Sequence, residues 1–425
     1  MPGKRPPPRV LLANEAGGGR GHVAKLAAVA RALGPGLPKV AALGRGRFAG
    51  ELAPWCEQVT AAPPLRPEAA EGAAPAAGNA TWGDYLAAIG LAREDVVRRG
   101  LAFWRQLIVA ENISILVADY APLAMRAAQG LKAEGWEIAI VSIGTGYGVP
   151  PAHLDRYPVL MEDHARVVHP EDEVLALVNR VAGAFGFDPL PRLPAIGAAD
   201  LALPCSFAFL DPYADTRAPG ELCPPSAGPV PLAGGGGELF AYFAGGEAAA
   251  GAFVRALEVL PMPRRAYLPG VGGAMLERLA AAGVAVETAP LAAAEIAART
   301  RLLLCAGQHG TLCLAALAGL PAVVWPGHLE QLFHARRAAA RGLVRLVPGL
   351  AVGTGAAVGG GWAGGADVAG AIAGAVRAAW EDRGLVRAAR DLAAELRPDH
   401  PADPLSELAR RLAPVVARAR AFGAG

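Results

Sequence analysis

The amino-acid sequence predicts an α/β fold with two parallel-sheet domains. In each half of the 425 residues, short apolar runs alternate with alanine-rich helical stretches, and this alternation is typical of a parallel sheet flanked by helices. Proline and glycine crowd the segment 211–237 between the halves, as expected of a linker or an interdomain crossing. In both halves a glycine-bearing turn leads from an apolar run directly into a helix, which is where ligands of such folds bind.

The expected strands and helices are placed by their apolar runs and by the residues that end them. In the first half we expect strands at 9–14, 114–120 and 138–144, and helices at 22–33, 121–135 and 170–185. In the second half we expect strands at 238–246, 264–270, 283–290, 301–307 and 321–327, a helix that ends at Leu260, and amphipathic helices at the end of the chain. Loops are predicted at 61–78 and 349–365 from their Ala, Pro and Gly content.

This pattern divides the chain into domains. We expect a first domain at 1–210, a linker at 211–237, a second domain at 238–395, and C-terminal helices at 396–425 that could pack back on the first domain. A chain of this length suffices for two or three domains, each with a sizeable core.

Composition and charge argue against several classes of protein. Hydrophobic residues make up 53% of the chain and charged residues 18%, which is typical of a globular rather than a disordered protein. Lys and Arg total 40 against 38 Asp and Glu, so no basic stripe is expected for binding nucleic acid. The sequence contains no run of about 18 apolar residues, so we expect no membrane span. We expect a cytoplasmic protein, and loose attachment to the inner face of the membrane stays open.

The cysteines are scattered and odd in number. They show no CxxC pair and no histidine at metal-ligand spacing, so we expect reduced thiols and no metal site. Cys313 could be a reactive thiol, but a small core residue is the more common role. The five positions are Cys56, Cys205, Cys223, Cys305 and Cys313.

A glycine-rich loop follows the first expected strand, in the stretch ANEAGGGRGHVAKL. Its glycines would let the backbone approach a ligand, although their spacing fits a dinucleotide-binding fingerprint poorly. His22 comes at the end of this loop, at the carboxyl edge of the expected sheet, where ligands of parallel sheets bind. The alternative is that His22 lies at a helix start and forms its hydrogen bonds with the backbone.

Asp119 lies at the end of the strand 114–120 and is expected on the same edge as His22. A carboxylate bound to one imidazole nitrogen fixes the tautomer and leaves the other nitrogen able to take a proton. Because no obvious nucleophilic Ser or Cys accompanies the pair, it predicts activation of a substrate hydroxyl rather than covalent catalysis. Asp119 could instead cap the helix that follows it.

The stretch CAGQHGTLCLAALAGLP, residues 305–321, joins an expected strand to an alanine-rich helix through a glycine turn. Backbone N–H groups at the start of such a helix bind anions, so we expect Gly307, Gly310 and Thr311 to lie around a diphosphate. His309 would add a hydrogen-bond donor there, or it is a histidine of a surface loop.

Glu330 and Gln331 follow the strand 321–327, at the start of another expected helix. An adjacent carboxylate and amide suit the hydroxyl groups of a sugar. The alternative is that they are ordinary polar residues in the first turn of a helix, where acids are favoured.

The span from Cys305 to Gly342 resembles the carboxyl-terminal signature of the family 1 (UDP-glycosyltransferase-like) glycosyltransferases, which runs HGGxGTxxEALxxGxPxxxxPxxxDQxxNAxRxxxxG. In the first half, Gly21 and His22 match the GH of the family's first loop, and Asp119 matches its strand-end aspartate. The residues that fall on the signature without a gap are Gly307, Gly310, Thr311, Ala315, Gly319, Pro321, Pro326, Gln331, Ala335, Arg337 and Gly342.

The resemblance implies a GT-B architecture, in which two Rossmann-like domains face a cleft, with the acceptor in the first domain and the nucleotide sugar in the second. It also implies an inverting, metal-independent transfer to a hydroxyl of a small-molecule, lipid or glycan acceptor, with no cofactor besides the nucleoside-diphosphate sugar. In these roles His22 would deprotonate the acceptor hydroxyl, and Asp119 would orient the imidazole and balance its charge.

The same resemblance implies the residues that bind the donor, and it also shows departures from the family. Ala306 replaces the leading His of the signature, and Leu314 replaces the Glu that usually holds the ribose. Loss of such a charge-assisted hydrogen bond costs about 1.5–3 kcal/mol, so the donor nucleotide stays open, with UDP and dTDP the commonest in the family. The implied diphosphate site is Gly307, Gln308, His309, Gly310 and Thr311, and the implied sugar site is Glu330 and Gln331.

Two other functions remain possible at this point. A nucleotide-sugar 2-epimerase shares the GT-B architecture but normally needs more carboxylates than we can place. A degenerate GT-B protein would bind a sugar nucleotide or a partner without turnover, which Ala306 and Leu314 favour and the His22–Asp119 pair disfavours. The acceptor is not identified, although the loops near 61–85 and 144–157 predict an aromatic, partly apolar pocket.

Overall fold

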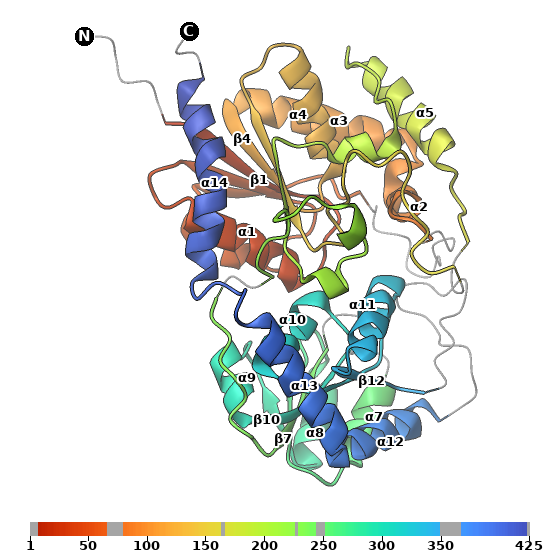
Figure 1. The fold of residues 1–425 in the computed structure, drawn as a ribbon. Coiled ribbons are helices and arrows are strands. Elements are labelled where there is room, and N and C mark those ends of the chain that lie inside the picture. Colours follow the sequence, from red (N-terminus) through yellow and green to blue (C-terminus); the bar gives the residue numbers. More distant parts are fainter. Residues whose placement is uncertain are drawn as a thin grey trace. The chain divides into compact units, whose positions relative to one another are not determined.

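The computed structural model describes residues 7–65, 80–162, 166–225, 228–243, 251–348 and 367–422. The chain forms two compact units, one of Met1–Ala227 with Asp403–Gly425 and the other of Gly228–Ala402. Each unit contains a six-stranded sheet with helices packed against it (Figure 1). The predicted loop at 349–365, and residues 66–78 of the loop predicted at 61–78, lie outside the described residues.

The first unit is built on a parallel sheet with the strand order β3-β2-β1-β4-β5-β6. Its strands are β1 (Arg9–Asn14), β2 (Lys39–Leu43), β3 (Gln58–Ala61), β4 (Ile113–Ala118), β5 (Ala139–Gly144) and β6 (Leu201–Pro204). Its helices are α1 (Arg20–Ala32), α2 (Trp82–Leu86), α3 (Glu94–Ala110), α4 (Pro122–Ala133), α5 (Glu171–Gly183) and α14 (Pro404–Ala421). Short helical turns are η1 (Ala49–Glu51), η2 (Ala53–Trp55), η3 (Ala87–Leu91), η4 (Leu193–Gly197), η5 (Ala208–Leu210) and η6 (Ala214–Thr216).

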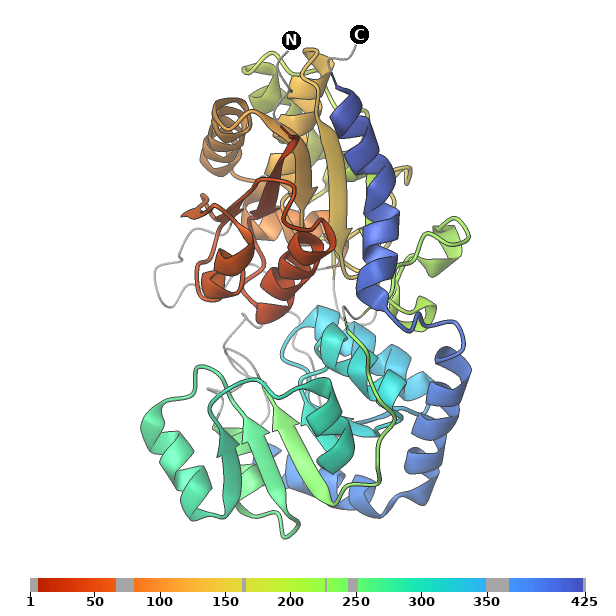
Figure 2. The same ribbon diagram turned by 90° about the vertical axis from the view of Figure 1, so that its left-hand side faces the viewer.

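Alternation along β1 divides the core of the first unit between the two faces of the sheet. Val10 and Leu12 point to the face covered by α1 and α14, because successive side chains of a strand point to opposite sides. Helix α14 contributes its own apolar stripe to that core through Leu408 and Leu412. Figure 2 shows α14, in blue, running along this sheet beside α1. Helices α3 and α4 pack together against the strands from the other side.

The second unit repeats the arrangement, with the strand order β12-β11-β10-β7-β8-β9, again all parallel. Its strands are β7 (Glu238–Tyr242), β8 (Arg264–Tyr267), β9 (Val284–Glu287), β10 (Thr300–Cys305), β11 (Ala322–Val324) and β12 (Val344–Leu346). Its helices are α7 (Ala252–Glu258), α8 (Gly273–Ala281), α9 (Ala293–Arg299), α10 (His309–Ala318), α11 (Leu329–Ala340), α12 (Val368–Glu381) and α13 (Arg383–Leu396).

Each sheet has one point where the strand order reverses. In the first sheet β1 lies between β2 and β4, and in the second β7 lies between β8 and β10. Loops that leave neighbouring strands at such a point diverge to opposite faces of the sheet, which opens a crevice at the carboxyl ends. The strand order therefore marks one candidate binding position in each unit.

The two parallel sheets with flanking helices confirm the predicted α/β class. The boundary between the units falls between residues 227 and 228, inside the segment 211–237 that we expected as a linker. Residues 396–402 belong to the second unit, and the chain returns to the first at Asp403. No helix among the described residues is long and apolar enough to cross a membrane.

Candidate functional site

The reversal point of the first sheet brings together two residues singled out in the sequence. His22 is the third residue of α1, which follows β1, and Asp119 directly follows β4. The His22 Nδ1 and Asp119 Oδ2 atoms are 3.0 Å apart and form a hydrogen bond. Asp119 is 2% exposed, whereas the His22 side chain is 30% exposed. The carboxylate is thus buried, and the imidazole that it holds reaches the surface of the unit.

The glycine loop passes directly over the imidazole. A Cβ atom placed on Gly17 would lie 2.3 Å from Cγ of His22, much closer than two carbon atoms can approach. Glycine is needed at this position so that the backbone can pack flat on the ring. The loop therefore holds the histidine, in addition to any contact it makes with a ligand.

Hydrogen bonds to the end of β1 hold Asp119 in place. Its N–H donates to the carbonyl of Ala13 (2.9 Å), and its own carbonyl accepts from Nδ2 of Asn14 (2.9 Å). On the other side, a Cβ atom on Gly144 would lie 3.5 Å from Asp119 Oδ1. These contacts position the carboxylate without occupying the oxygen that binds His22.

A second carboxylate, Glu15, is buried behind this pair at the start of α4. Its two carboxyl oxygens accept hydrogen bonds from the N–H groups of Leu123 and Ala124, at 3.0 Å each. Such an acid is favoured where a helix leaves its first N–H groups without partners. Burial raises the pKa of Glu15 to about 8, because desolvation outweighs the hydrogen bonds that lower it. Glu15 was not among the residues predicted from the sequence, although an acid inside an apolar strand-to-loop segment is a signal in itself.

A cluster of aromatic rings adjoins His22 through Tyr120. Tyr120 stacks on the imidazole, with ring centroids 5.5 Å apart and planes 7° apart. Tyr120 also lies against Trp82 (5.0 Å) and Tyr85 (6.0 Å) of α2, and Tyr147 meets Trp82 edge-on at 5.5 Å. A narrow pocket beside these rings is lined by apolar side chains that include Trp82, Tyr120 and Tyr157.

Part of this cluster depends on an unusual backbone. Tyr120 has a φ of 58°, in the left-handed region that non-glycine residues rarely adopt. Neighbouring segments stabilise this conformation. The carbonyl of Tyr120 accepts a hydrogen bond from the N–H of Glu15 (3.3 Å), and Tyr120 precedes the helix that Glu15 caps. Strained backbone supported in this way often occurs at functional sites.

In the second unit, the glycine turn lies at the carboxyl end of β10, beside the reversal point. Gly307 has a φ of 87°, and a Cβ atom there would lie 3.0 Å from the carbonyl oxygen of Gln331. Gln308 directly precedes α10, and its carbonyl oxygen accepts hydrogen bonds from the N–H groups of Thr311 and Leu312. Gly310 is exposed, with open space around its Cβ position. The first turn of α10 thus presents a small, open backbone surface, as an anion site requires.

His309 differs from its neighbours in this turn, because its side chain faces inward. The residue is 7% exposed, and its ring lies 5.1 Å from that of His334, between centroids. Its Nε2 atom is 3.7 Å from Sγ of Cys313. Its role in binding a diphosphate stays a prediction, as do those of Gln308 and Thr311.

Glu330 and Gln331 lie in the first turn of α11, as predicted for the start of this helix. Gln331 is 4% exposed, and its Oε1 atom accepts a hydrogen bond from the N–H of Gly327 at 2.7 Å. Glu330 is only half-buried. Because the Gly307 loop packs on the backbone of Gln331, the structure brings the two predicted donor groups together within the second unit.

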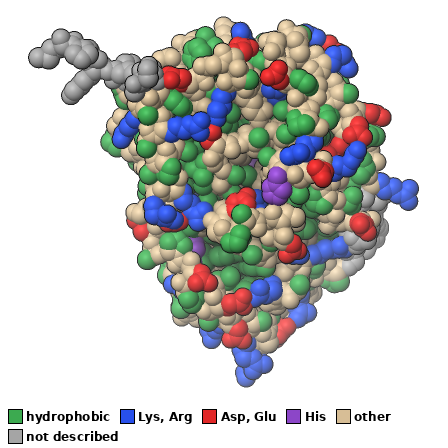
Figure 3. Space-filling model, turned by 45° about the horizontal axis from the view of Figure 1, so that its top comes forward, with side chains coloured by type: hydrophobic (Ala, Val, Ile, Leu, Met, Phe, Trp, Pro, Cys, Tyr) green, Lys and Arg blue, Asp and Glu red, His purple; other side chains and the backbone are tan. Residues whose placement is uncertain are grey.

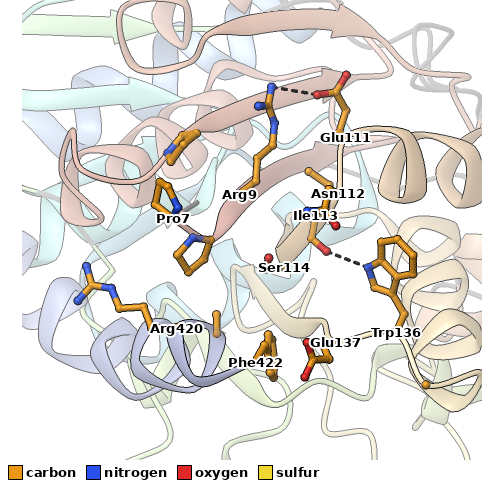
Figure 4. A pocket seen from close by; sticks show the side chains of 14 residues that line it. Pro7, Arg9, Glu111, Asn112, Ile113, Ser114, Trp136, Glu137, Arg420 and Phe422 are labelled. Atoms are coloured by element: carbon orange, nitrogen blue, oxygen red, sulfur yellow. Dashed lines mark hydrogen bonds and ion pairs between the residues drawn. The ribbon is translucent and has the colours of Figure 1, made fainter. Parts of the chain in front are cut away.

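Another pocket of the first unit lies elsewhere, at the amino ends of β1, β4 and β5. Its volume is about 670 Å³. Figure 4 shows Arg9 reaching Glu111 on one side and Trp136 bonded to the carbonyl of Ile113 on the other. Ligands of parallel sheets bind at the opposite, carboxyl edge, so this pocket is separate from the His22–Asp119 site.

Two observations bear on other kinds of ligand. Among the described residues, no group of three or more His, Cys, Asp or Glu side chains is placed to hold a metal ion. On the face drawn in Figure 3, Lys and Arg side chains are interspersed with Asp and Glu side chains, without a surface of one sign.

The fold is that of the GT-B glycosyltransferases. The chain is similar to the spinosyn rhamnosyltransferase SpnG complexed with thymidine diphosphate, at 19% identity and a TM-score of 0.62, over 95% of this chain and 100% of that one. It is also similar to the calicheamicin glycosyltransferase CalG4, at 16% identity and a TM-score of 0.63, over 97% and 99%. A UDP-glucosyltransferase from Polygonum tinctorium matches at 18% identity and a TM-score of 0.59, over 98% and 99%. No protein-family model and no curated protein sequence matches the chain.

Proposed function

We propose that the protein is a glycosyltransferase that moves a sugar from a nucleoside-diphosphate sugar to a hydroxyl group of a small-molecule, lipid or glycan acceptor. The observation that carries this proposal is the His22–Asp119 hydrogen bond at the reversal point of the first sheet of a GT-B fold. A buried carboxylate paired with a partly exposed imidazole is the arrangement that a general base requires.

In the proposed reaction, His22 Nδ1–H donates to Asp119, so Nε2 carries the lone pair. The acceptor hydroxyl gives its proton to Nε2 while its oxygen attacks the anomeric carbon of the donor. The bond from that carbon to the diphosphate oxygen breaks on the opposite face, and the electron pair leaves with the diphosphate. Asp119 then stabilises the imidazolium, and the product has the inverted anomeric configuration.

The leaving diphosphate would lie on the first turn of α10. The exposed backbone at Gly310 and the glycine turn at Gly307 leave room for it, and the positive end of the helix dipole would stabilise the developing charge. Because this stabilisation comes from the backbone, we propose that the transfer needs no bound metal ion. Glu330, half-buried in the first turn of α11, is the candidate partner for the sugar hydroxyls together with Gln331.

Structural neighbours guide the choice of donor. One of them was solved with thymidine diphosphate and another with UDP, which makes UDP and dTDP sugars the first donors to test. Ala306 is fully buried and Leu314 is apolar, so neither can offer the charged contacts that the family signature has at these positions.

The test is transfer from a panel of UDP, dTDP and GDP sugars to phenolic and aliphatic alcohols, followed by mass spectrometry and by NMR of the anomeric proton. We expect an inverted glycoside, formed equally well with EDTA present. His22→Ala should abolish transfer while calorimetry shows unchanged donor binding, and Arg31→Ala, which alters an exposed residue at the other end of α1, should retain activity.

Other outcomes would contradict the proposal. A donor converted to its 2-epimer without transfer would show an epimerase, and donor binding without any turnover would show a degenerate binding protein. Full activity of the His22→Ala variant would disprove the role of the general base.

A further inference from the structure

Two of the five cysteines become neighbours in the fold, although 17 residues (206–222) separate them in the chain. Cys205 follows β6, and it pairs with Cys223 in a parallel β-bridge. The Cys223 N–H donates to the carbonyl of Pro204 (2.9 Å), and the Ser206 N–H donates to the carbonyl of Cys223 (3.2 Å). These two hydrogen bonds fix the segment around Cys223 at the edge of the sheet, as a strand would be fixed.

This pairing brings the cysteines close enough for a disulfide. Paired residues of neighbouring strands have Cα atoms about 4.8 Å apart, which lies within the range of about 4.4–6.8 Å that disulfides span. Both side chains also point to one face, because both belong to the core that α1 and α14 cover. Cys205 is 7% and Cys223 is 3% exposed.

The surroundings of the two thiols differ. A hydrogen bond between them raises the pKa of Cys205 and lowers the pKa of Cys223. The guanidinium of Arg411, from α14, further lowers the pKa of Cys223, and it is held there by Glu407 (2.7 Å) and by the carbonyl of Gly220 (3.1 Å). A cation beside a thiol favours the thiolate, which is the reactive form.

We propose that Cys205 and Cys223 form a dithiol site that hydrogen peroxide oxidises to an intramolecular disulfide. The Cys223 thiolate attacks one peroxide oxygen, the O–O bond breaks, and hydroxide leaves to give Cys223 sulfenic acid. The Cys205 sulfur then attacks Cys223 Sγ and expels its hydroxyl group. The thiol protons end in the two water molecules formed, so two thiols and one peroxide give one disulfide. Peroxide is the chosen oxidant because it is nearly as small as water and can reach buried sulfur.

The disulfide would close the segment 206–222, which borders the candidate site. In this segment Asp211 and Arg217 form a buried ion pair, and Arg217 Nη2 donates to the carbonyls of Gly146 (3.1 Å) and Val149 (2.7 Å). Oxidation would therefore tie β6 to the segment that supports the loop containing Tyr147. Because it concerns only the first unit, this inference does not depend on the proposed transfer reaction.

The test is peptide mapping of the full-length chain after stepwise addition of peroxide, with alkylation of the remaining thiols. We expect one cross-linked peptide pair that contains Cys205 and Cys223, lighter by two hydrogen atoms, and its loss on treatment with dithiothreitol. Oxidation should raise the melting temperature by about 5–10 °C, since a closed loop of this length restricts the unfolded chain. That shift should be absent from Cys223→Ser and Cys223→Ala and should persist in Cys56→Ser.

Arg411→Gln provides a kinetic test with a matched control. It should slow disulfide formation severalfold, whereas Arg410→Gln should not, because the adjacent Arg410 bonds Glu407 but neither cysteine. Recovery of Cys205 and Cys223 as free thiols, or as separate sulfinic acids, would overturn the proposal. Equal rates of disulfide formation in the two arginine variants would show that Arg411 does not promote the oxidation.

Discussion

At the scale of single residues, the His22–Asp119 pair depends on the charge of Asp119 as well as on its position. Asp119→Asn keeps a side chain of the same shape 3.0 Å from Nδ1, but its amide group can donate to that nitrogen and reverse the tautomer. Nε2 would then carry the proton and could not act as a base. We expect kcat for transfer to fall by about 10³–10⁴-fold, with unchanged donor affinity in calorimetry.

Asp95→Asn is the control for this change, since Asp95 is an exposed acid of α3 that pairs with Arg93. It should leave kcat within twofold of the wild-type value, within the range expected for surface substitutions. An Asp119→Asn variant with nearly full kcat would show that the carboxylate has a structural role only.

Glu15 should make the stability of the chain depend on pH. The pKa of its buried carboxyl is about 8, against 4.5 for the unperturbed group. Between these values the folded chain keeps a proton that the unfolded chain releases, so the free energy of unfolding falls as pH rises from about 5 to about 8. Glu15→Gln removes the titrating group. The difference in the free energy of unfolding between the wild type and this variant, measured by urea unfolding, should therefore shift against the wild type as pH rises across that range.

The control for Glu15 is Glu173→Gln, a change at an exposed acid in α5. The free energy of unfolding of this variant should differ from that of the wild type by the same amount at every pH. If the free energy of unfolding of Glu15→Gln also differs from that of the wild type by a constant amount at every pH, Glu15 is ionised in the folded state across the whole range. Its carboxylate would then be an ordinary helix cap.

His22 and Asp119 could be predicted from sequence because both lie in segments that leave the carboxyl ends of strands. His22 and Asp119 were placed on one edge because parallel strands end together. Glu15 and Tyr120 could not be assigned, because their roles depend on a helix cap and a left-handed turn formed by distant segments. Cys205 and Cys223 were read as separate thiols, because only the β-bridge brings them together.

At the scale of elements, two substitutions in the turn into α10 should separate the effect of backbone strain from the effect of ligand binding. Gly307→Ala would force a side chain into the left-handed region, at a cost of about 1–2 kcal/mol, and its Cβ would press on Gln331 and Val324 at 3.0 Å. We expect a lower melting temperature and weaker donor binding. Gly310→Ala adds its Cβ to open space, so it should keep or raise the melting temperature and weaken donor binding alone.

Calorimetry with UDP and dTDP, combined with thermal unfolding, checks both variants. If Gly310→Ala binds the nucleotide diphosphates as tightly as the wild type does, the first turn of α10 is not the diphosphate site.

Strands with a clear apolar run were expected, including the short strands β8, β9 and β11. The central strands β1, β4, β5, β7 and β10 were all expected. Strand β6 was missed because its four residues, Leu201–Pro204, end in a proline and are too short to show a period. Helix α3 was also missed, although its buried residues Val97, Leu101, Trp104 and Ile108 recur at helical spacing.

At the scale of the whole molecule, the first unit is discontinuous in sequence, because α14 returns to it after the second unit is complete. The apolar stripe of α14 could be read from the sequence. Packing on the first domain was expected only as one possibility, because such a stripe could cover an exposed apolar face of either sheet. The contact with α1 is what assigns it to the first unit.

This arrangement predicts that a core substitution in α14 destabilises the first unit and not the second, although the second unit is adjacent in sequence. Leu412 is 1% exposed in the core of the first unit, and Leu412→Ala should cost about 2–5 kcal/mol there. Hydrogen exchange should then accelerate in β1 and β4 while β7 and β10 keep their wild-type protection. Arg410→Ala, on the exposed side of the same helix, should change neither set. Equal acceleration in both sheets would mean that the two units unfold as one cooperative body, and the division of the chain would then describe its architecture but not its stability.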